Sequence, residues 1–163
     1  MCEGTIVLIR ENVLSKRISQ PARVRWHWFV HLIALALNGG GLGVVVYRSR
    51  GSPHFTSTHG LSGFIATVLA AVVCLNGFMT LFNVELRKFI KPNLNKLIHA
   101  SLGIAAIGFG IWGTITGYRT RWFTSRVGQT GLHMCYALTS IICFWMIVRP
   151  LINGFTRIKN MVT

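Results

Sequence analysis

Four long apolar runs constrain this chain more than any other feature of its sequence. They cover about residues 26–47, 59–82, 97–118 and 130–148. Each meets the roughly 20 predominantly apolar residues that a helix needs to cross the hydrocarbon core of a bilayer. Because unpaired backbone groups are costly in lipid, and because the runs lack the two-residue alternation of a membrane barrel, they predict helices. The predicted fold class is an all-α membrane protein, an antiparallel bundle of four transmembrane helices.

Composition argues against a soluble protein. Hydrophobic residues make up 52% of the 163 residues and charged residues only 12%, against roughly 25% charged in ordinary soluble domains. The net charge of +14 could suggest a nucleic-acid binder. The basic residues, however, lie between the apolar runs and form no single stripe. We therefore expect a lipid bilayer as partner and no nucleic acid, and the apolar content also excludes an intrinsically disordered chain.

The distribution of lysine and arginine predicts the orientation. Twelve of the 17 lie in the N-terminal stretch, the second connection and the C-terminal tail, and five lie in the other two connections. The positive-inside rule then places both termini in the cytosol. The expected organisation is a cytosolic N-terminal segment (1–25), a four-span bundle (26–148) and a cytosolic tail (149–163). The early apolar run at 5–9 is too short for a signal peptide.

Histidines are the main ionisable residues inside the predicted spans. They are His27, His31, His59, His99 and His133, with His54 in the first outer connection. An ionisable group inside a membrane is expensive and marks a functional site by default. The alternative is an interfacial histidine bonded to headgroups or carbonyls. Distances along antiparallel helices predict two layers, with His27 and His99 in one and His59 and His133 in the other.

Glycines near two of these histidines favour haem over a bare metal ion. Gly63 follows His59 by four residues, and Gly103 follows His99 by four. Residues four apart share a helix face, so each histidine lies on a face with room for a flat macrocycle. Close helix packing through small residues is the competing explanation. No carboxylate inside a span could complete a di-iron or zinc site, whereas paired imidazoles suit six-coordinate haem iron.

Two other patterns carry less weight. The four cysteines form neither a C-x-x-C pair nor a C-x-x-C-H haem-attachment site. Residues 108–113 match the dinucleotide-binding pattern G-x-G-x-x-G letter for letter. They lie in the middle of a span with no preceding strand, so the context that phosphate binding needs is absent. A smooth face for helix or porphyrin packing is the better interpretation.

Several segments together resemble the cytochrome b561 family, in particular its animal b561 domain-containing transmembrane reductases. These segments are Arg23-Val24-Arg25-Trp26-His27-Trp28, Thr58-His59-Gly60 with Gly63, Lys96-Leu97-Ile98-His99-Ala100-Ser101 and Trp122-Phe123-Thr124. The resemblance covers nearly the whole chain. It implies a partial version of a six-helix fold that binds two b-type haems. It also implies electron flow from cytosolic ascorbate to monodehydroascorbate or ferric iron on the other side.

The resemblance also implies site residues. His27 and His99 correspond to the axial ligand pair of the cytosolic-side haem b, and His59 to one ligand of a second haem. The family partner of His59 lies on a span upstream of this chain, which lacks about two N-terminal helices by this comparison. His133 would be a weak substitute, and His31 a hydrogen-bonding core residue. Lys96 corresponds to a basic residue that meets ascorbate.

Arg10 is a further candidate for ascorbate binding. The implied location is an endomembrane (endoplasmic reticulum or vesicle) or the plasma membrane, and a homodimer remains open. The alternative function is a truncated, non-catalytic membrane protein or isoform that binds one haem or none.

Overall fold

The computed structural model describes residues 19–51 and 53–162, and within these ranges its regular structure is helical. The helices are α2 (Gln20–Arg48), α3 (Thr58–Leu81), α4 (Asn83–Leu86), α5 (Pro92–Tyr118) and α6 (Arg121–Val162). Four of them are long and apolar enough to cross a membrane: α2, α3, α5 and the part of α6 up to Val148. The predicted all-α membrane fold with four spans is confirmed. Arg10 lies outside the described residues.

Local sequence signals explain where the helices begin. Ser57 precedes α3, and its hydroxyl accepts a hydrogen bond from the Gly60 amide at 3.1 Å, which satisfies one of the free amides of the first turn. Helices α2 and α5 each carry a proline in their first turn, Pro21 and Pro92. Proline fits there because the missing N–H would have no partner inside the helix.

The connection before α6 differs from the prediction. Residues 119–128 were expected to be a polar connection, but the chain is already helical from Arg121. The helix is interrupted at Gly128, whose φ of 69° and ψ of 173° are not helical. Only glycine adopts this conformation readily. The uninterrupted part of α6 therefore begins close to residue 130, where the sequence predicted the fourth span to start, although the apolar segment of α6 runs from Arg121 to Val148.

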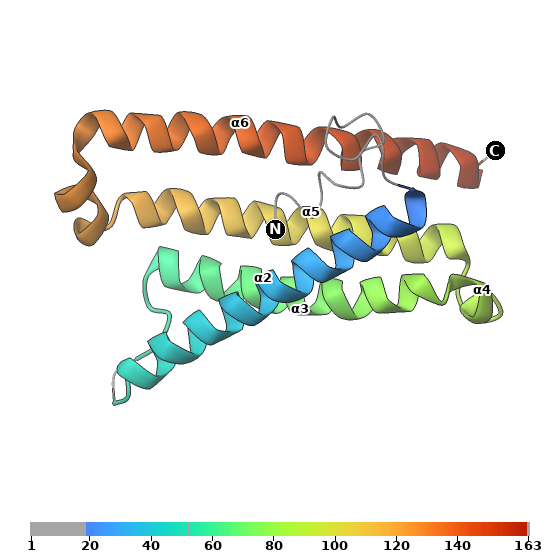
Figure 1. The fold of residues 1–163 in the computed structure, drawn as a ribbon, viewed down its shortest axis with the longest axis horizontal. Coiled ribbons are helices and arrows are strands. Elements are labelled where there is room, and N and C mark those ends of the chain that lie inside the picture. The colour runs from blue at the N-terminus through green and yellow to red at the C-terminus, as the bar shows by residue number, and fades with distance from the viewer. Residues whose placement is uncertain (1–18, 52, 163) are drawn as a thin grey trace.

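Helices α6, α5 and α3 lie side by side in that order, and α2 lies across α3 (Figure 1). The most extensive helix contact joins α3 to α5, which run antiparallel. Helix α6 packs on α5, and α2 crosses α3 obliquely. Among the described helices, α2 has no close backbone contact with α5 or α6. The α3–α5 pair is therefore the structural core, and α2 and α6 form its two edges.

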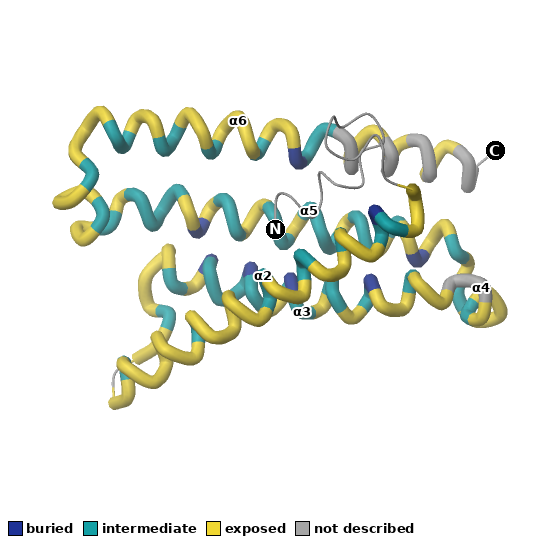
Figure 2. Tube along the Cα trace, viewed as in Figure 1, coloured by how far each residue is buried: buried dark blue, intermediate teal, exposed yellow. Residues whose placement is uncertain are grey.

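Small residues form the seam between α3 and α5. The buried residues of α3 are Ser62, Ala66, Ala70 and Gly77, and Figure 2 shows buried positions along both central helices. At Gly113 of α5, a Cβ atom would lie 3.3 Å from the Ser62 hydroxyl oxygen and 3.4 Å from the backbone of α3. Such close approach is the usual way in which membrane helices associate.

Large apolar side chains point outward. Leu37 of α2 and Leu75 of α3 are 73% and 71% exposed. In water such a surface would be unfavourable, but hydrocarbon chains cover it at no cost. The polarity of the molecule is thus that of a membrane protein, with small residues inside and large apolar residues toward lipid.

Candidate functional site

The histidines lie near the two ends of the α3–α5 pair. We call the end where α5 begins and α3 finishes the proximal end, and the end where α3 begins and α5 finishes the distal end. His99 of α5 lies at the proximal end, over Gly77 of α3. His59 of α3 lies at the distal end, over Gly117 of α5. Eighteen residues of helix, about 27 Å, separate His59 from Gly77, so the two ends lie near opposite faces of a bilayer.

Three histidines gather at the proximal end. His27 of α2 contacts His31 one turn later, with ring centroids 4.5 Å apart and an interplanar angle of 61°. His31 in turn lies close enough to both His27 and His99 to interact with them electrostatically. Trp28, next to His27, packs against Phe78 of α3 with centroids 6.3 Å apart. His27 and His99 therefore lie at the same end of the molecule, as their depth along the spans predicts.

The expected role of His31 as a hydrogen-bonding core residue stays a prediction. Its ring is half-buried, but its Nε2 atom is buried and has no hydrogen-bond partner in the part of the chain that the structure describes. Leaving a buried polar atom unsatisfied costs about 1–3 kcal/mol. The His31 ring packs edge-on against the His27 ring.

A polar pair lies beside His99. The Asn76 side-chain amide donates a hydrogen bond to the Asn95 side-chain oxygen at 3.1 Å. Asn95 is only 2% exposed and precedes His99 by one helical turn, while Asn76 adjoins Gly77. The hydrogen bond therefore joins α3 to α5 at the level where the His99 ring lies on Gly77.

The His59 ring has a defined hydrogen bond at the distal end. Its Nδ1 atom lies 2.8 Å from the backbone oxygen of Gly113. A carbonyl oxygen only accepts hydrogen bonds, so Nδ1 must carry the proton and donate. In a neutral imidazole, Nε2 is then left with its lone pair. Histidines that bind metals commonly have this arrangement, with the second ring nitrogen held by a carbonyl.

The remaining predicted site residues are less closely tied to these histidines. His133 is exposed on α6, which packs on α5 and has no close backbone contact with α3 among the described helices. The structure therefore does not bring His133 to His59. His54 is exposed in the connection before α3. Lys96 is exposed at the proximal end, three residues before His99 on α5.

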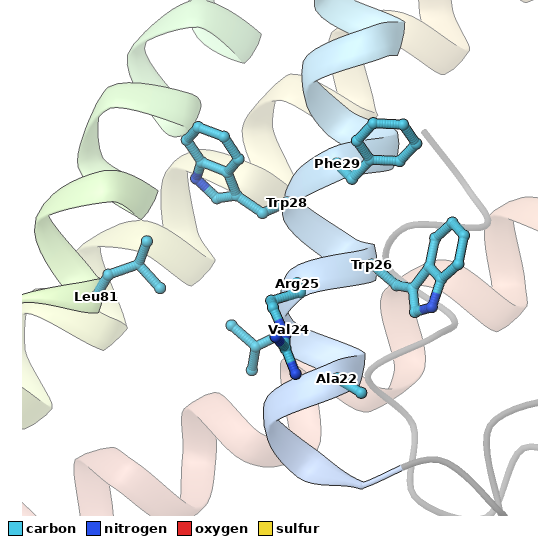
Figure 3. A pocket seen from close by; sticks show the side chains of 7 residues that line it. All are labelled: Ala22, Val24, Arg25, Trp26, Trp28, Phe29 and Leu81. Atoms are coloured by element: carbon cyan, nitrogen blue, oxygen red, sulfur yellow. The ribbon is translucent and has the colours of Figure 1, made fainter.

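An open hollow lies at the first turns of α2 (Figure 3). Its lining is mostly apolar and includes Trp26, Trp28 and Phe29 of α2 and Leu81 of α3, with Arg25 as the charged member. Tryptophans at the end of a span are typical of the membrane interface. The apolar lining is suited to acyl chains rather than to an anionic substrate, so we do not assign the hollow to ascorbate.

The residues present fit a haem. A Cβ atom added at Gly63 or Gly103 would meet nothing within 4 Å, so the faces next to His59 and His99 are open, as a flat macrocycle requires. The unprotonated Nε2 of His59 is a suitable iron ligand. A metal bound by protein groups alone fits less well, because within 19–51 and 53–162 no three His, Cys, Asp or Glu side chains are placed so that they could hold a metal ion.

Sequence reasoning did not identify Gly77 or the Asn76–Asn95 pair as parts of the site. A signal for Gly77 was available. His59, Gly63 and Gly77 recur forty residues later as His99, Gly103 and Gly117. Only the first two members of this repeat were used in the prediction. The asparagines carry no comparable signal, because their pairing depends on which helices meet.

The fold and the site define a class of protein: a polytopic helical membrane protein with histidines near both membrane faces. The chain belongs to the cytochrome b561 family, since its residues 1–124 match the family model described as eukaryotic cytochrome b561. The family prediction from the sequence is confirmed.

Named relatives agree with this assignment. The transmembrane reductase CYB561D2 of Mus musculus is 30% identical over 147 residues, which cover 87% of this chain and 66% of that protein. The Bos taurus protein of the same name is 29% identical over 162 residues, covering 98% of this chain and 72% of that protein. The probable transmembrane reductase CYB561D1 of Homo sapiens is 27% identical over 140 residues, covering 85% and 61%. This chain thus spans just under two thirds of the mouse relative. No solved structure matches it.

Proposed function

We propose that this chain is a transmembrane oxidoreductase that passes electrons from cytosolic ascorbate to monodehydroascorbate or ferric iron on the other side. The observation that carries the proposal is the placement of His99 and His59 near opposite ends of one antiparallel helix pair, each against a glycine of the other helix. A carrier that moves electrons across a membrane needs a redox centre near each face. The family and the names of the relatives support this class of activity.

The proposed cofactor is haem b, which supplies reversible one-electron chemistry at its iron when bound. His27 and His99 would hold it at the proximal end, and His59 would provide a ligand at the distal end. The Gly113 carbonyl keeps the proton on Nδ1 of His59 and so leaves Nε2 available. The small buried residues of α3 let α3 and α5 pack closely between the two histidines.

The proximal end is the proposed cytosolic, ascorbate-facing end. At neutral pH ascorbate is an anion, and in giving up one electron and one proton it becomes monodehydroascorbate. A cationic surface favours the approach of such an anion. Lys96 lies three residues before His99 at this end, and we assign it, with Arg10, to ascorbate docking.

Optical spectra of the purified full chain test the cofactor and the electron donor together. We expect dithionite and ascorbate each to produce reduced b-type bands, and His99→Ala and His27→Ala to remove the bands of the proximal haem. His31→Phe is the matched control, because it lies one turn from His27 and keeps an aromatic ring. It should retain the bands.

Two results would contradict the proposal. A folded protein with no b-type bands would instead indicate a non-catalytic membrane protein. Bands that persist in both His99→Ala and His27→Ala at full stoichiometry would show that other residues bind the haem.

A further inference from the structure

Helices α3 and α5 carry the same pattern of one histidine and one glycine. Eighteen residues separate His59 from Gly77 on α3, and the same eighteen separate His99 from Gly117 on α5. Eighteen residues are five turns of an α-helix, so the histidine and the glycine of each helix lie on one face. When two such helices pack antiparallel, the histidine of each can meet the glycine of the other.

The structure has both of these contacts, and their geometry is similar. A Cβ atom on Gly117 would lie 3.0 Å from Cε1, 3.1 Å from Nδ1 and 3.7 Å from Nε2 of His59. A Cβ atom on Gly77 would lie 3.0 Å from Cε1, 3.6 Å from Nδ1 and 3.9 Å from Nε2 of His99. In both pairs the same edge of the ring faces the glycine, and Nε2 is the more distant nitrogen.

The distances leave little room for a larger residue at either glycine. A Cβ contact of 3.0 Å is tighter than nine in ten real ones, so even alanine would require the ring to move by a few tenths of an ångström. The His59 ring cannot move freely, because its Nδ1 is already bonded to the Gly113 carbonyl at 2.8 Å. Displacing the ring would weaken that hydrogen bond and with it the preference for a proton on Nδ1.

Other glycines of α5 lack this relation. A Cβ atom on Gly108 or Gly110 would meet nothing within 4 Å. At Gly113 the atoms nearest to an added Cβ belong to Ser62 and to the backbone of α3, so close helix packing accounts for that glycine. At Gly77 and Gly117 the space is taken by an imidazole.

We propose that Gly77 and Gly117 are positioning residues which hold the imidazoles of His99 and His59 ready for ligation before any cofactor binds. This inference rests on the proposed function, because it explains how the proposed haem ligands His99 and His59 are oriented. It adds Gly77 and Gly117 as the residues that set this orientation. It also predicts that each glycine acts on one histidine only.

Nitrogen NMR of the full chain in detergent micelles, labelled with ¹⁵N-histidine and free of haem, tests the inference directly. The His59 and His99 signals are identified by their loss in His59→Gln and His99→Gln. We expect His59 to carry its proton on Nδ1. Gly117→Ala should shift the His59 signals, and Gly117→Val should shift them further toward the Nε2-protonated form. The His99 signals should stay unchanged in both variants.

The reciprocal variant and a matched control complete the experiment. Gly77→Ala should shift the His99 signals and leave those of His59 unchanged. Gly43→Val on α2, where a Cβ atom would meet nothing within 4 Å, should alter neither. Haem titration gives a second measurement: we expect Gly77→Ala to raise the dissociation constant about 10- to 100-fold, as is typical when groups that orient a ligand are changed. Gly43→Val should leave it unchanged.

The outcomes separate this inference from the proposed function. If the wild-type chain takes up no haem, the proposed function fails, and the NMR experiment still decides the role of the glycines. If haem binds but Gly117→Ala and Gly77→Ala leave the histidine signals and haem affinity unchanged, the positioning role is wrong while the function stands. A loss of signal dispersion throughout the chain in the alanine variants, with no selective effect on one histidine, would also overturn it.

Discussion

At the scale of single residues, the polar groups at the proximal end set the properties of the proposed site. His27, His31 and His99 lie together there, the Asn76–Asn95 hydrogen bond joins α3 to α5 beside them, and Lys96 lies exposed on α5. Each of these groups can be changed singly without altering the apolar surface that faces lipid. Mutations here therefore test function and local stability separately.

Lys96→Gln should weaken the use of ascorbate without affecting the cofactor. The lysine is exposed, and exposed charge pairs contribute about 0.2–1 kcal/mol. We expect the ascorbate concentration for half-maximal reduction to rise about two- to fivefold, and the effect to shrink at high ionic strength. Rates of haem reduction at increasing ascorbate concentration measure this effect.

Lys88→Gln is the control for Lys96, since Lys88 is an exposed lysine in the connection just before α5. The dithionite-reduced spectrum should be identical in both variants. An unchanged ascorbate dependence in Lys96→Gln would remove Lys96 from the docking site.

A double-mutant cycle measures the Asn76–Asn95 hydrogen bond. Asn76→Ala and Asn95→Ala should each destabilise the protein, because each leaves a polar group at the α3–α5 contact without the partner seen in the structure. Hydrogen bonds between membrane helices contribute about 0.6 kcal/mol on average and at most about 1.7 kcal/mol, so we expect a coupling energy in this range. Reversible unfolding in mixed micelles gives the four free energies. Asn38→Ala, at an exposed position of α2, should have little effect, and a coupling of zero would contradict the pairing.

At the scale of the elements, helix ends and helix contacts follow different rules. The ends depend on residues that are close in sequence, such as Ser57 before α3 and Pro92 at the start of α5. The contact between α3 and α5 depends on small residues far apart in the chain, as at Gly113 and Ser62. The interruption of α6 at Gly128 also depends on local sequence, because the positive φ of this one residue breaks the helix.

Gly128→Ala should destabilise the protein by about 1–3 kcal/mol, the cost of placing a residue with a side chain in this region of φ and ψ. The same substitution at Gly39 is the control, because Gly39 lies inside α2 and a Cβ there would meet nothing within 4 Å. Alanine favours a helix interior by about 1 kcal/mol over glycine. The free energy of unfolding in micelles should therefore fall for Gly128→Ala and rise for Gly39→Ala. If Gly128→Ala were neutral, the interruption would not depend on this backbone conformation.

At the scale of the whole molecule, orientation in the membrane determines which end can meet cytosolic ascorbate. The excess of lysine and arginine in the N-terminal stretch, the second connection and the tail predicts that the proximal end is cytosolic. The proposed direction of electron flow depends on this orientation. The exposed apolar surfaces of α2 and α6 fit a chain that is surrounded by lipid.

Cysteine labelling tests the orientation. In a chain whose four native cysteines are replaced, we introduce Asn93→Cys in the first turn of α5 or Thr56→Cys before α3, both at exposed positions. A membrane-impermeant maleimide applied from the cytosolic side should label Asn93→Cys and not Thr56→Cys. Both should react once detergent opens every membrane, which shows that each thiol is accessible. The reverse pattern would place the proximal end on the far side and exclude ascorbate docking from the cytosol there.

The sequence by itself determined the four spans, their helical form and the depth of each histidine. Hydropathy and the need to satisfy backbone groups in lipid act on each segment alone, so these features can be derived before any contact is known. Even here one element was missed: the helical turns from Arg121 to the interruption at Gly128 lie in what was expected to be a polar connection.

Only the tertiary structure decided how the helices meet. The pairing of α3 with α5, the side-by-side order of the helices, and the contacts of His59 with Gly117 and of His99 with Gly77 all depend on the rotation and register of neighbouring helices. Those quantities come from the packing of small residues against one another across the seam, and a small residue looks the same in sequence whether it faces a helix or lipid. The proton on Nδ1 of His59 likewise depends on a carbonyl fifty-four positions away in the chain.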